Sequence, residues 1–387
     1  MAPKGEASGS KDFKDRISPR AIKGLARDLK WAWPEFPVEE FSAGATTGLA
    51  DLEMKGRVVH VADALAATLP GDFTESAGIL EKALERPDFD GWIIYPVDDY
   101  VARYGIDHPE VALPLIAGLT SRWSCEFAIR PFIELHPELT FEYFDRWIDS
   151  DDEHLRRLVC EGSRPRLPWG ARLKAFIDDP SPTIRLLDRL VDDPSPYVRK
   201  SVANHLNDIS KDHPDLAVET ATRWLAEAGQ PEGSDAAADG QTVGPDAGRR
   251  RWIVSHGLRS LIKAGHPDAL RMLGFDPEAV VSLTSFRAAP GEIRIGDAVT
   301  IELSLTAADS TPVMVDYAIH HAGSATRRSP KVFKLKRTVL EPGVETHFRR
   351  EHRIREVSVR RIHPGPHLIE VQVNGKILAA ATIEVGP

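Results

Sequence analysis

The pattern of apolar and polar positions divides the chain into two parts. From Asp12 to about Phe275, apolar residues recur at helical spacing, as in Val58, Val61 and Leu65, and short Pro and Gly breaks separate the stretches. This pattern predicts roughly a dozen helices. After Phe275 the chain changes to alternating, β-branched runs bounded by turn residues, which predicts short strands.

Two helical segments repeat at a constant offset of 43 residues, so that Trp147 aligns with Leu190 and Arg156 aligns with Arg199. Apolar positions fall on apolar positions and polar positions on polar ones. A two-helix repeat of about 40–47 residues, with Asp-Pro before the second helix and an Arg inside it, is typical of HEAT-type solenoids. We therefore predict an all-α repeat domain that forms an α-α superhelix.

The clearest repeat predicts a helix that starts near Pro196. Asp193 or Ser195 can cap its N-terminus, and proline is tolerated in a first turn because no amide hydrogen is lost there. A buried stripe is expected at i, i+4 and i+8, formed by Val198, Val202 and Leu206. The polar residues of the segment are expected on its other faces, towards the concave surface of the solenoid: Arg199, Lys200, His205 and Asp208.

The second part predicts a small β-sandwich, immunoglobulin-like in its strand pattern only, because it has no cysteines. Asn374-Gly375 fits a tight hairpin turn. The expected strands cover residues 298–305, 314–319, 332–336, 344–347 and 367–373.

Length and composition agree with a multi-domain protein, since 387 residues exceed the usual size of one domain. We expect a disordered N-terminus (1–11), a helical repeat domain (12–275) with a flexible loop at 229–248, and a sandwich (276–387). The chain shows no signal peptide and no stretch of about 20 apolar residues, so a cytoplasmic protein is expected. Cys125 and Cys160 are interpreted as small buried residues.

Charge is divided unevenly between the two parts. From Val280 onward there are 15 Lys or Arg and 11 Asp or Glu, a formal charge of +4. The whole chain has a net charge of −9, so the residues before Val280 together carry −13. Basic residues cluster around one predicted hairpin: Arg327, Arg328, Lys331 and Lys334. A solvated sheet face would explain them, but the cluster favours contact with a polyanion.

Two carboxylates on successive repeats, Glu161 and Asp208, are the candidates for chemistry. Either could be a solvated helix-face acid. However, Glu161 is followed by arginines and by Trp169, and a carboxylate beside an aromatic face suits a cationic reaction centre such as an oxocarbenium ion. The stretch from His205 to His213 carries metal-ligand chemistry, but it lacks a strict motif such as His-Glu-x-x-His, and we predict no metal site.

Four segments resemble the AlkC-type DNA alkylation repair glycosylases of the AlkC/AlkD superfamily. They are Glu126-Phe-Ala-Ile-Arg-Pro-Phe132, Glu161-Gly-Ser-Arg-Pro-Arg-Leu-Pro-Trp169, Ser201-Val-Ala-Asn-His-Leu-Asn-Asp208 and Trp252-Ile-Val-Ser-His-Gly-Leu258. The similarity extends from about Phe13 to Phe275. The C-terminal part resembles the immunoglobulin-like domain that one branch of the family carries.

The resemblance implies a monofunctional DNA glycosylase of base excision repair. Such an enzyme hydrolyses the N-glycosidic bond of cationic alkylated bases, 3-methyladenine and 3-methylcytosine, in duplex DNA. It implies that the lesion stays largely in the base stack and that the solenoid grips and bends the backbone. No metal or organic cofactor is implied, and the family favours a monomer.

The same resemblance assigns roles to single residues. Glu161 and Asp208 would be the main catalytic carboxylates, one stabilising the sugar cation and one handling the water, with Glu126 as a third acid. Glu126 could equally lie on a helix and pair with Arg122 or Arg130, and Trp169, expected to stack on the lesion, could instead fill the core. The expected phosphate and groove contacts are Arg164, Arg166, Arg199, Lys200, Lys211, His205 and His256, and the sandwich would clamp DNA through Arg327, Arg328, Lys331 and Lys334.

Two other classes of function compete with a glycosylase. One is a non-enzymatic HEAT scaffold that binds DNA or protein, with the acids merely structural. The other is a carbohydrate- or surface-binding module built around the sandwich, which the absence of an export signal disfavours. The presence of Glu161 and Asp208 together, at positions that match the family motif, favours the enzyme.

Overall fold

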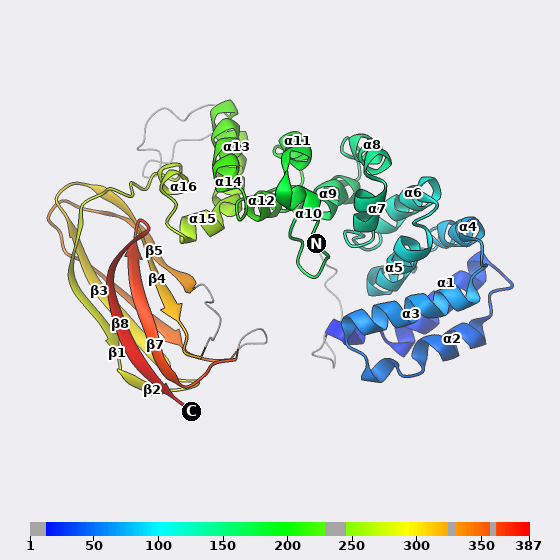
Figure 1. Cartoon of the computed structure of the whole chain (residues 1–387), viewed down its shortest axis with the longest axis horizontal. Helices are drawn as coiled ribbons and strands as arrows, with labels where there is room; N and C mark the ends of the chain where they lie inside the picture. The colour runs from blue at the N-terminus through cyan, green and yellow to red at the C-terminus, as the bar shows by residue number, and fades with distance from the viewer. Residues whose placement is uncertain (1–12, 229–244, 324–329, 357–360) are drawn as a thin grey trace. The chain divides into compact units, whose positions relative to one another are not determined.

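A computed structural model describes residues 13–228, 245–323, 330–356 and 361–387 of the chain (Figure 1). The predicted disordered N-terminus and the basic pair Arg327-Arg328 lie outside these ranges. The chain packs as two units, Met1–Asp212 and His213–Pro387. None of the helices in the described ranges combines the length and the apolar character that a membrane crossing requires.

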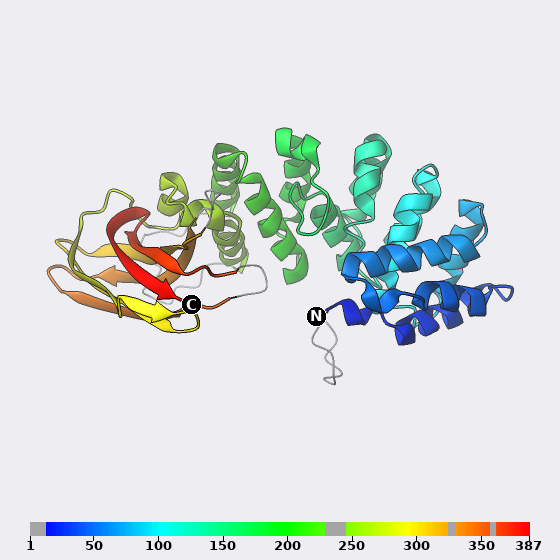
Figure 2. The same ribbon diagram turned by 60° about the horizontal axis from the view of Figure 1, so that its bottom comes forward.

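The described part of the first unit is entirely helical, and Figure 2 shows the same succession of helices from a second side. Its 3-10 helices are η1 (Phe13–Arg16), η2 (Leu49–Asp51) and η3 (Gly91–Ile93). Its α-helices are α1 (Pro19–Ala32), α2 (Val38–Thr46), α3 (Met54–Thr68), α4 (Phe73–Ala83), α5 (Ile94–Tyr104), α6 (Pro109–Thr120), α7 (Ile129–Leu135), α8 (Pro137–Trp147), α9 (Glu153–Gly162), α10 (Lys174–Asp178), α11 (Ser181–Leu190) and α12 (Pro196–Ile209).

The predicted repeat is visible as two matching helix pairs, α8/α9 and α11/α12. The first helices end at Trp147 and Leu190, and the second begin at Glu153 and Pro196, so both boundaries keep the offset of 43. The two aligned arginines, Arg156 and Arg199, also make equivalent hydrogen bonds. Arg156 donates to the carbonyl oxygens of residues 150 and 151, and Arg199 donates to those of residues 193 and 194. Each arginine therefore closes the turn between the two helices of its own repeat.

Helix α12 starts where the sequence predicts. Ser195 caps it, its side chain accepting from the amide of Tyr197, and Pro196 occupies the first turn. The predicted stripe of Val198, Val202 and Leu206 is buried, which is confirmed. The expectation that His205 and Asp208 lie on open faces is wrong, because α12 packs against both α9 and α11 and buries more than one face.

The second unit begins with helices α13 (Pro214–Glu227), α14 (Pro245–Gly257), α15 (Arg259–Lys263) and α16 (Pro267–Arg271). The loop predicted over 229–248 extends four residues too far, because helix α14 starts at Pro245. Residues 229–244 lie outside the described ranges. The change from helix to strand falls between Arg271 and Val281. The domain boundary at residue 275 remains a prediction, since the division into packed units falls elsewhere.

Eight strands follow within the described residues: β1 (Val281–Ala289), β2 (Glu292–Arg294), β3 (Ala298–Ala307), β4 (Thr311–His320), β5 (Lys331–Leu340), β6 (Thr346–Arg353), β7 (Gly365–Val373) and β8 (Lys376–Gly386). One sheet has the order β1-β3-β6 and the other β2-β8-β7-β4-β5. All neighbouring strands are antiparallel except β2 and β8. The sequence pattern missed β1 and β2, and for β8 it gave only the hairpin turn and no strand range.

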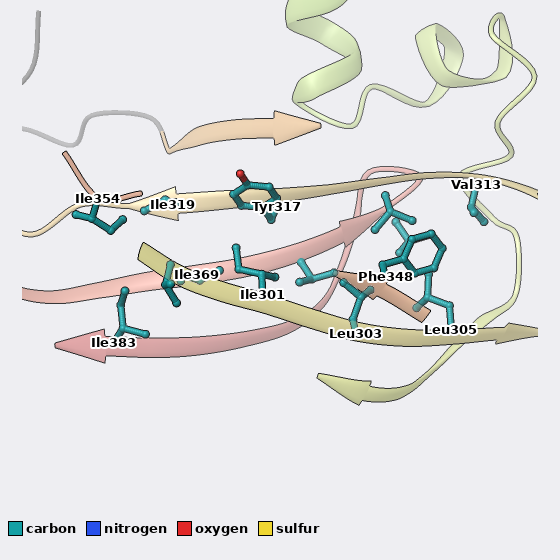
Figure 3. Packing of buried hydrophobic residues seen from close by; sticks show 14 of the residues in the cluster. Ile301, Leu303, Leu305, Val313, Tyr317, Ile319, Phe348, Ile354, Ile369 and Ile383 are labelled. Carbon is teal, nitrogen blue, oxygen red and sulfur yellow. The ribbon is translucent and has the colours of Figure 1, made fainter. Parts of the chain in front are cut away.

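The sandwich core forms between the two sheets. Alternate residues of β3, Ile301, Leu303 and Leu305, are buried, as period-2 side-chain alternation requires. Figure 3 shows them gathered with Tyr317 and Ile319 of β4 in one apolar cluster. Apolar burial therefore holds this sandwich together without a disulfide, and both cysteines of the chain, buried and unpaired, belong to the first unit.

Asn374 anchors the predicted hairpin between β7 and β8 and ties it to the rest of the unit. It has a positive φ of 46° and Gly375 one of 83°, as a tight turn of this kind requires. Its buried side chain accepts from the amide of Met314 (2.8 Å) and donates to the carbonyl oxygens of Asp276 (2.9 Å) and Pro312 (3.1 Å). The turn is thus also a tertiary contact.

We expect Asn374→Ala to lower the free energy of unfolding of this unit by about 2–4 kcal/mol, because it removes three hydrogen bonds and strains a left-handed residue. Urea denaturation followed by far-UV circular dichroism measures the change. Asn374→Gly removes the same hydrogen bonds but tolerates the positive φ, so it should lose less. Equal losses in the two variants would show that the backbone conformation contributes nothing.

Candidate catalytic site

Glu161 lies in the last turn of α9 and is 7% exposed. The helix end is held close to α7, because a Cβ atom at Gly162 would come within 2.4 Å of Ile129. Glycine there allows this close approach, and Arg164 follows two residues after the helix end. Glu161 Oε1 accepts from Arg164 Nη1 (2.6 Å), and Oε2 accepts from the hydroxyl of Ser201 on α12 (2.6 Å).

Asp208 lies in the last turn of α12 and is 1% exposed. Its Oδ2 accepts from Nε of the same Arg164 at 2.8 Å, and its Oδ1 accepts from Lys211 Nζ at 2.9 Å. One guanidinium group therefore joins the two acids that the sequence singles out. The structure brings Glu161 and Asp208 together, although 47 positions separate them in the chain.

Glu126 is joined to this pair through Arg157. Arg157 lies 3.4 Å from a Glu126 carboxylate oxygen and 3.6 Å from one of Glu161, and it stacks over the ring of Tyr197 at 4.6 Å. Acids and bases alternate along the whole arrangement. We call it the charge ladder, and it consists of Glu126, Arg157, Glu161, Arg164, Asp208 and Lys211.

The charge ladder keeps Glu161 ionised. Burial acts to raise the pKa of this carboxyl group, but Arg157, Arg164 and the hydrogen bond from Ser201 together outweigh it and lower the pKa below its usual value. Burial likewise acts to lower the pKa of Arg164, and Glu161 and Asp208 reverse that effect and raise it. A buried carboxylate that stays charged at neutral pH is what stabilisation of a cation requires.

Arg130 of α7 fixes the loop that leaves α9. It donates to the carbonyl oxygens of Gly162 (2.7 Å) and Arg164 (2.8 Å), and its Nε donates to that of Ala171 (2.9 Å). Burial lowers the pKa of this guanidinium to about 10, which leaves it charged at neutral pH. The backbone that carries Arg164 is therefore held in place independently of the acids.

Trp169 is presented at the tip of the same loop. Its side chain is 64% exposed, so the alternative that it fills the core is wrong. It has a left-handed φ of 67°, and Lys55 Nζ donates to its carbonyl oxygen at 2.7 Å. A bulky residue held in this conformation with an exposed ring is a candidate for ligand contact.

Two of the predicted surface contacts are corrected by the structure. Arg164 is 5% exposed and bridges the two acids, so it is part of the charge ladder and not an open phosphate contact. His205 is fully buried, and its Nδ1 lies 3.0 Å from the carbonyl oxygen of Cys160, so it has no exposed surface with which to contact a ligand.

The other predicted cations differ in their exposure and in the contacts that they already make. Arg166 forms two hydrogen bonds of 2.6 Å with Asp212, Lys200 is exposed, and His256 stacks on Trp252 with ring centroids 5.1 Å apart. Lys331 and Lys334 are exposed on β5, an edge strand. These residues remain predicted contacts, together with Arg199 and Lys211.

Sequence reasoning missed Arg157, Ser201 and Tyr197 and misplaced the partner of Glu126. Glu126 lies in a turn before α7, not in a helix, and it pairs with Arg157 and not with Arg122 or Arg130. A local signal for Arg157 existed, because residues four apart on a helix face each other and Arg157 precedes Glu161 by four. Ser201 and Tyr197 have no such signal, since they reach Glu161 and Arg157 from another helix.

Burial of His205 predicts a dependence of stability on pH. Burial is the main cause that lowers its pKa to about 4, whereas an unfolded histidine has a pKa near 6.5. Between these values the unfolded chain binds a proton that the folded chain does not, so this group reduces stability as pH falls from 7 to 4, by about 3 kcal/mol in all.

We therefore expect His205→Gln to unfold in urea with a shallower loss of stability between pH 7 and pH 4.5 than the wild type. A slope that does not change in His205→Gln would contradict a neutral buried imidazole.

A family model described as "DNA alkylation repair enzyme" matches residues 120–224, the segment that holds the entire charge ladder, and a model of the C-terminal immunoglobulin-like domain of YhaZ matches residues 282–387. A solved structure of the Pseudomonas fluorescens alkylpurine DNA glycosylase AlkC, bound to DNA with an abasic site analog, is similar with a TM-score of 0.86. It is 34% identical and covers 97% of this chain and 100% of its own. The chain belongs to the AlkC family.

A second similar protein comes from Bacillus subtilis. The "Uncharacterized protein YhaZ" of that organism is 32% identical over 379 residues, which cover 97% of this chain and 99% of the relative. Both relatives therefore match the helical unit and the sandwich together. The predicted fold class, helical repeats followed by an immunoglobulin-like sandwich, is confirmed.

Proposed function

We propose that this member of the AlkC family is a DNA repair glycosylase that excises 3-methyladenine and 3-methylcytosine from duplex DNA. The observation that carries the proposal is the charge ladder, which holds three carboxylates together and keeps Glu161 ionised despite burial. The related AlkC of Pseudomonas fluorescens, described as an alkylpurine glycosylase, supports the reaction class.

Excision of such a base requires carboxylates that stabilise positive charge, and it does not require a strong acid that protonates the departing base. Alkylation at a ring nitrogen makes the base cationic, so it leaves as a neutral molecule while positive charge develops on the sugar. We assign Glu161 and Asp208 to stabilising that charge and orienting the attacking water, with Glu126 as the third acid. Each ionised carboxylate offers about four lone-pair sites, and the partners bound to Glu161 and Asp208 occupy only some of them.

Arg157 and Arg164 have two opposing effects on this reaction. They keep Glu161 charged, but their own positive charges reduce the attraction between that acid and a sugar cation. The hydrogen bonds of Arg164 run to one oxygen of each acid, which fixes the two carboxylates relative to each other before substrate arrives. We propose this preorganisation as the role of Arg164.

We propose that the lesion reacts without being fully flipped out of the stack. Neither Glu161 nor Asp208 lines the base-sized cavity of this unit, so a base lodged in that cavity would have no carboxylate of this pair beside it. Trp169 would contact the lesion, and a monomer would hold the backbone through Arg166, Arg199, Lys200, Lys211 and His256. The sandwich would add contacts to DNA through Lys331 and Lys334.

Release of free base from duplex DNA that carries a single 3-methyladenine or 3-methylcytosine tests the proposal. We expect the wild-type protein to release both bases and to leave the same duplex without a lesion intact. Binding to the duplex without release of either base would instead favour the non-enzymatic scaffold.

A further inference from the structure

A cavity of about 280 Å³ lies beside the Trp169 loop, and apart from Trp169 none of its lining residues has a role in the proposed reaction. Residues of α3, α5 and α7 line it, together with residues 169–171. Its volume is more than enough for one nucleobase-sized ring compound. The proposed catalytic acids are absent from its lining.

Aromatic and aliphatic side chains form the walls of this cavity. Tyr95 and Phe127 lie nearly parallel, with ring centroids 5.4 Å apart at 25°, and Trp169 stands at the rim. Val59 and Ala102 complete the apolar lining. Flat walls of this kind select a flat ligand, and their faces attract positive charge.

Asp98 of α5 is a lining residue with no exposed surface. Within the described residues, neither of its carboxyl oxygens has a hydrogen-bond partner of normal geometry. Burial, then Asp99 and Glu126, raise the pKa of this group well above its usual value, and the nearby thiol of Cys125 offsets only part of that effect. Burial and the two neighbouring acids thus disfavour the charged form of Asp98, whereas a cation in the cavity would favour it.

The cations that line the cavity are already engaged. Lys55 donates to the Trp169 carbonyl oxygen, and Arg103 pairs with Asp63 at 2.8 Å and with Asp99 at 3.0 Å. Arg130 donates to three backbone carbonyl oxygens, as described above. Glu134, exposed on α7, places a further carboxylate at the rim.

We propose that this cavity binds a flat nitrogen cation of the amidinium type, of about nucleobase size, and that the bound cation favours the ionised form of Asp98 in the cavity wall. Asp98 has no exposed surface, so it acts on the ligand across the cavity wall, while Glu134 accepts hydrogen bonds from the ligand. The proposal does not depend on glycosylase activity, and its test uses no DNA.

Isothermal titration of the full-length protein with benzamidine, a flat cation, and benzamide, its neutral counterpart, tests the charge preference. We expect the wild type to bind benzamidine about tenfold or more tightly than benzamide. Equal affinities, or no binding of either compound, would overturn the proposal.

Two variants locate the site. Asp98→Asn keeps the shape of the side chain and should abolish the preference for benzamidine, whereas Asp145→Asn, on an exposed ion pair of α8, should keep it. Val59→Trp should abolish binding of both compounds by filling the cavity. Val59 is 43% exposed, so this second variant is expected to fold even if Asp98→Asn does not. Benzamidine binding that survives Val59→Trp unchanged would place the site elsewhere and reject the proposal.

Discussion

Replacing Glu161 by Gln is expected to slow single-turnover release of 3-methyladenine by about 10²–10³-fold, the range seen when one group that stabilises transition-state charge is removed. The amide keeps the size of the side chain and can still accept from Ser201. It loses the negative charge that the charge ladder keeps in place. Affinity for lesion-containing duplex should stay within about twofold, because the predicted phosphate contacts are separate residues.

Rapid-quench kinetics with enzyme in excess gives the release rate, and fluorescence anisotropy gives the affinity. Glu142→Gln, an exposed acid of α8, is the matched control and should behave as the wild type. A release rate that is unchanged in Glu161→Gln would remove this residue from the catalytic assignment. A fall in affinity as large as the fall in rate would make it a binding residue instead.

Replacing Arg164 by Met is expected to lower the free energy of unfolding by about 3–5 kcal/mol, the largest stability loss that we predict. The change leaves Glu161 and Asp208, which are 7% and 1% exposed, without the cation that joins them. Methionine preserves much of the volume, so the loss reports mainly on charge. Urea denaturation at pH 7 measures it.

Arg185 provides the comparison for Arg164. It also pairs with an aspartate, Asp145, but both side chains are more than 40% exposed. Arg185→Met should therefore cost less than about 1 kcal/mol, as exposed ion pairs do. Similar losses at the two positions would mean that burial does not set the strength of the charge ladder. Stability of Arg164→Met close to that of the wild type would contradict its bridging role.

Features that depend on local sequence were predicted well. The start of α12 at Pro196 and the turn at Asn374-Gly375 each follow from capping or turn chemistry within a few residues, and the offset of 43 follows from comparing two segments of the sequence directly. Two of the missed strands have weak local signals, whereas β1 does begin with alternating apolar and polar residues. Strand β2 has three residues, and β8 contains the run Ala379-Ala-Ala, which has weak strand propensity.

Features that depend on packing between distant segments were predicted less well. Periodicity identifies one buried face of α12, but contact with both α9 and α11 also buries His205. Arg164 was recognised as a cation near Glu161, and its second partner, Asp208, lies 44 residues further along the chain. Family resemblance supplied the three acids together, and their catalytic roles remain to be tested.

The acids of the charge ladder come from three separate places in the helical stack: the turn before α7, the end of α9 and the end of α12. In a solenoid each repeat contacts mainly its neighbours, so such stacks bend easily by small rotations between repeats. Arg157 and Arg164 tie neighbouring segments together at this point. The protein is therefore expected to be mechanically stiffest at its acids and to flex on either side of them, which would let it follow the contour of a long ligand while the spacing of the acids stays constant.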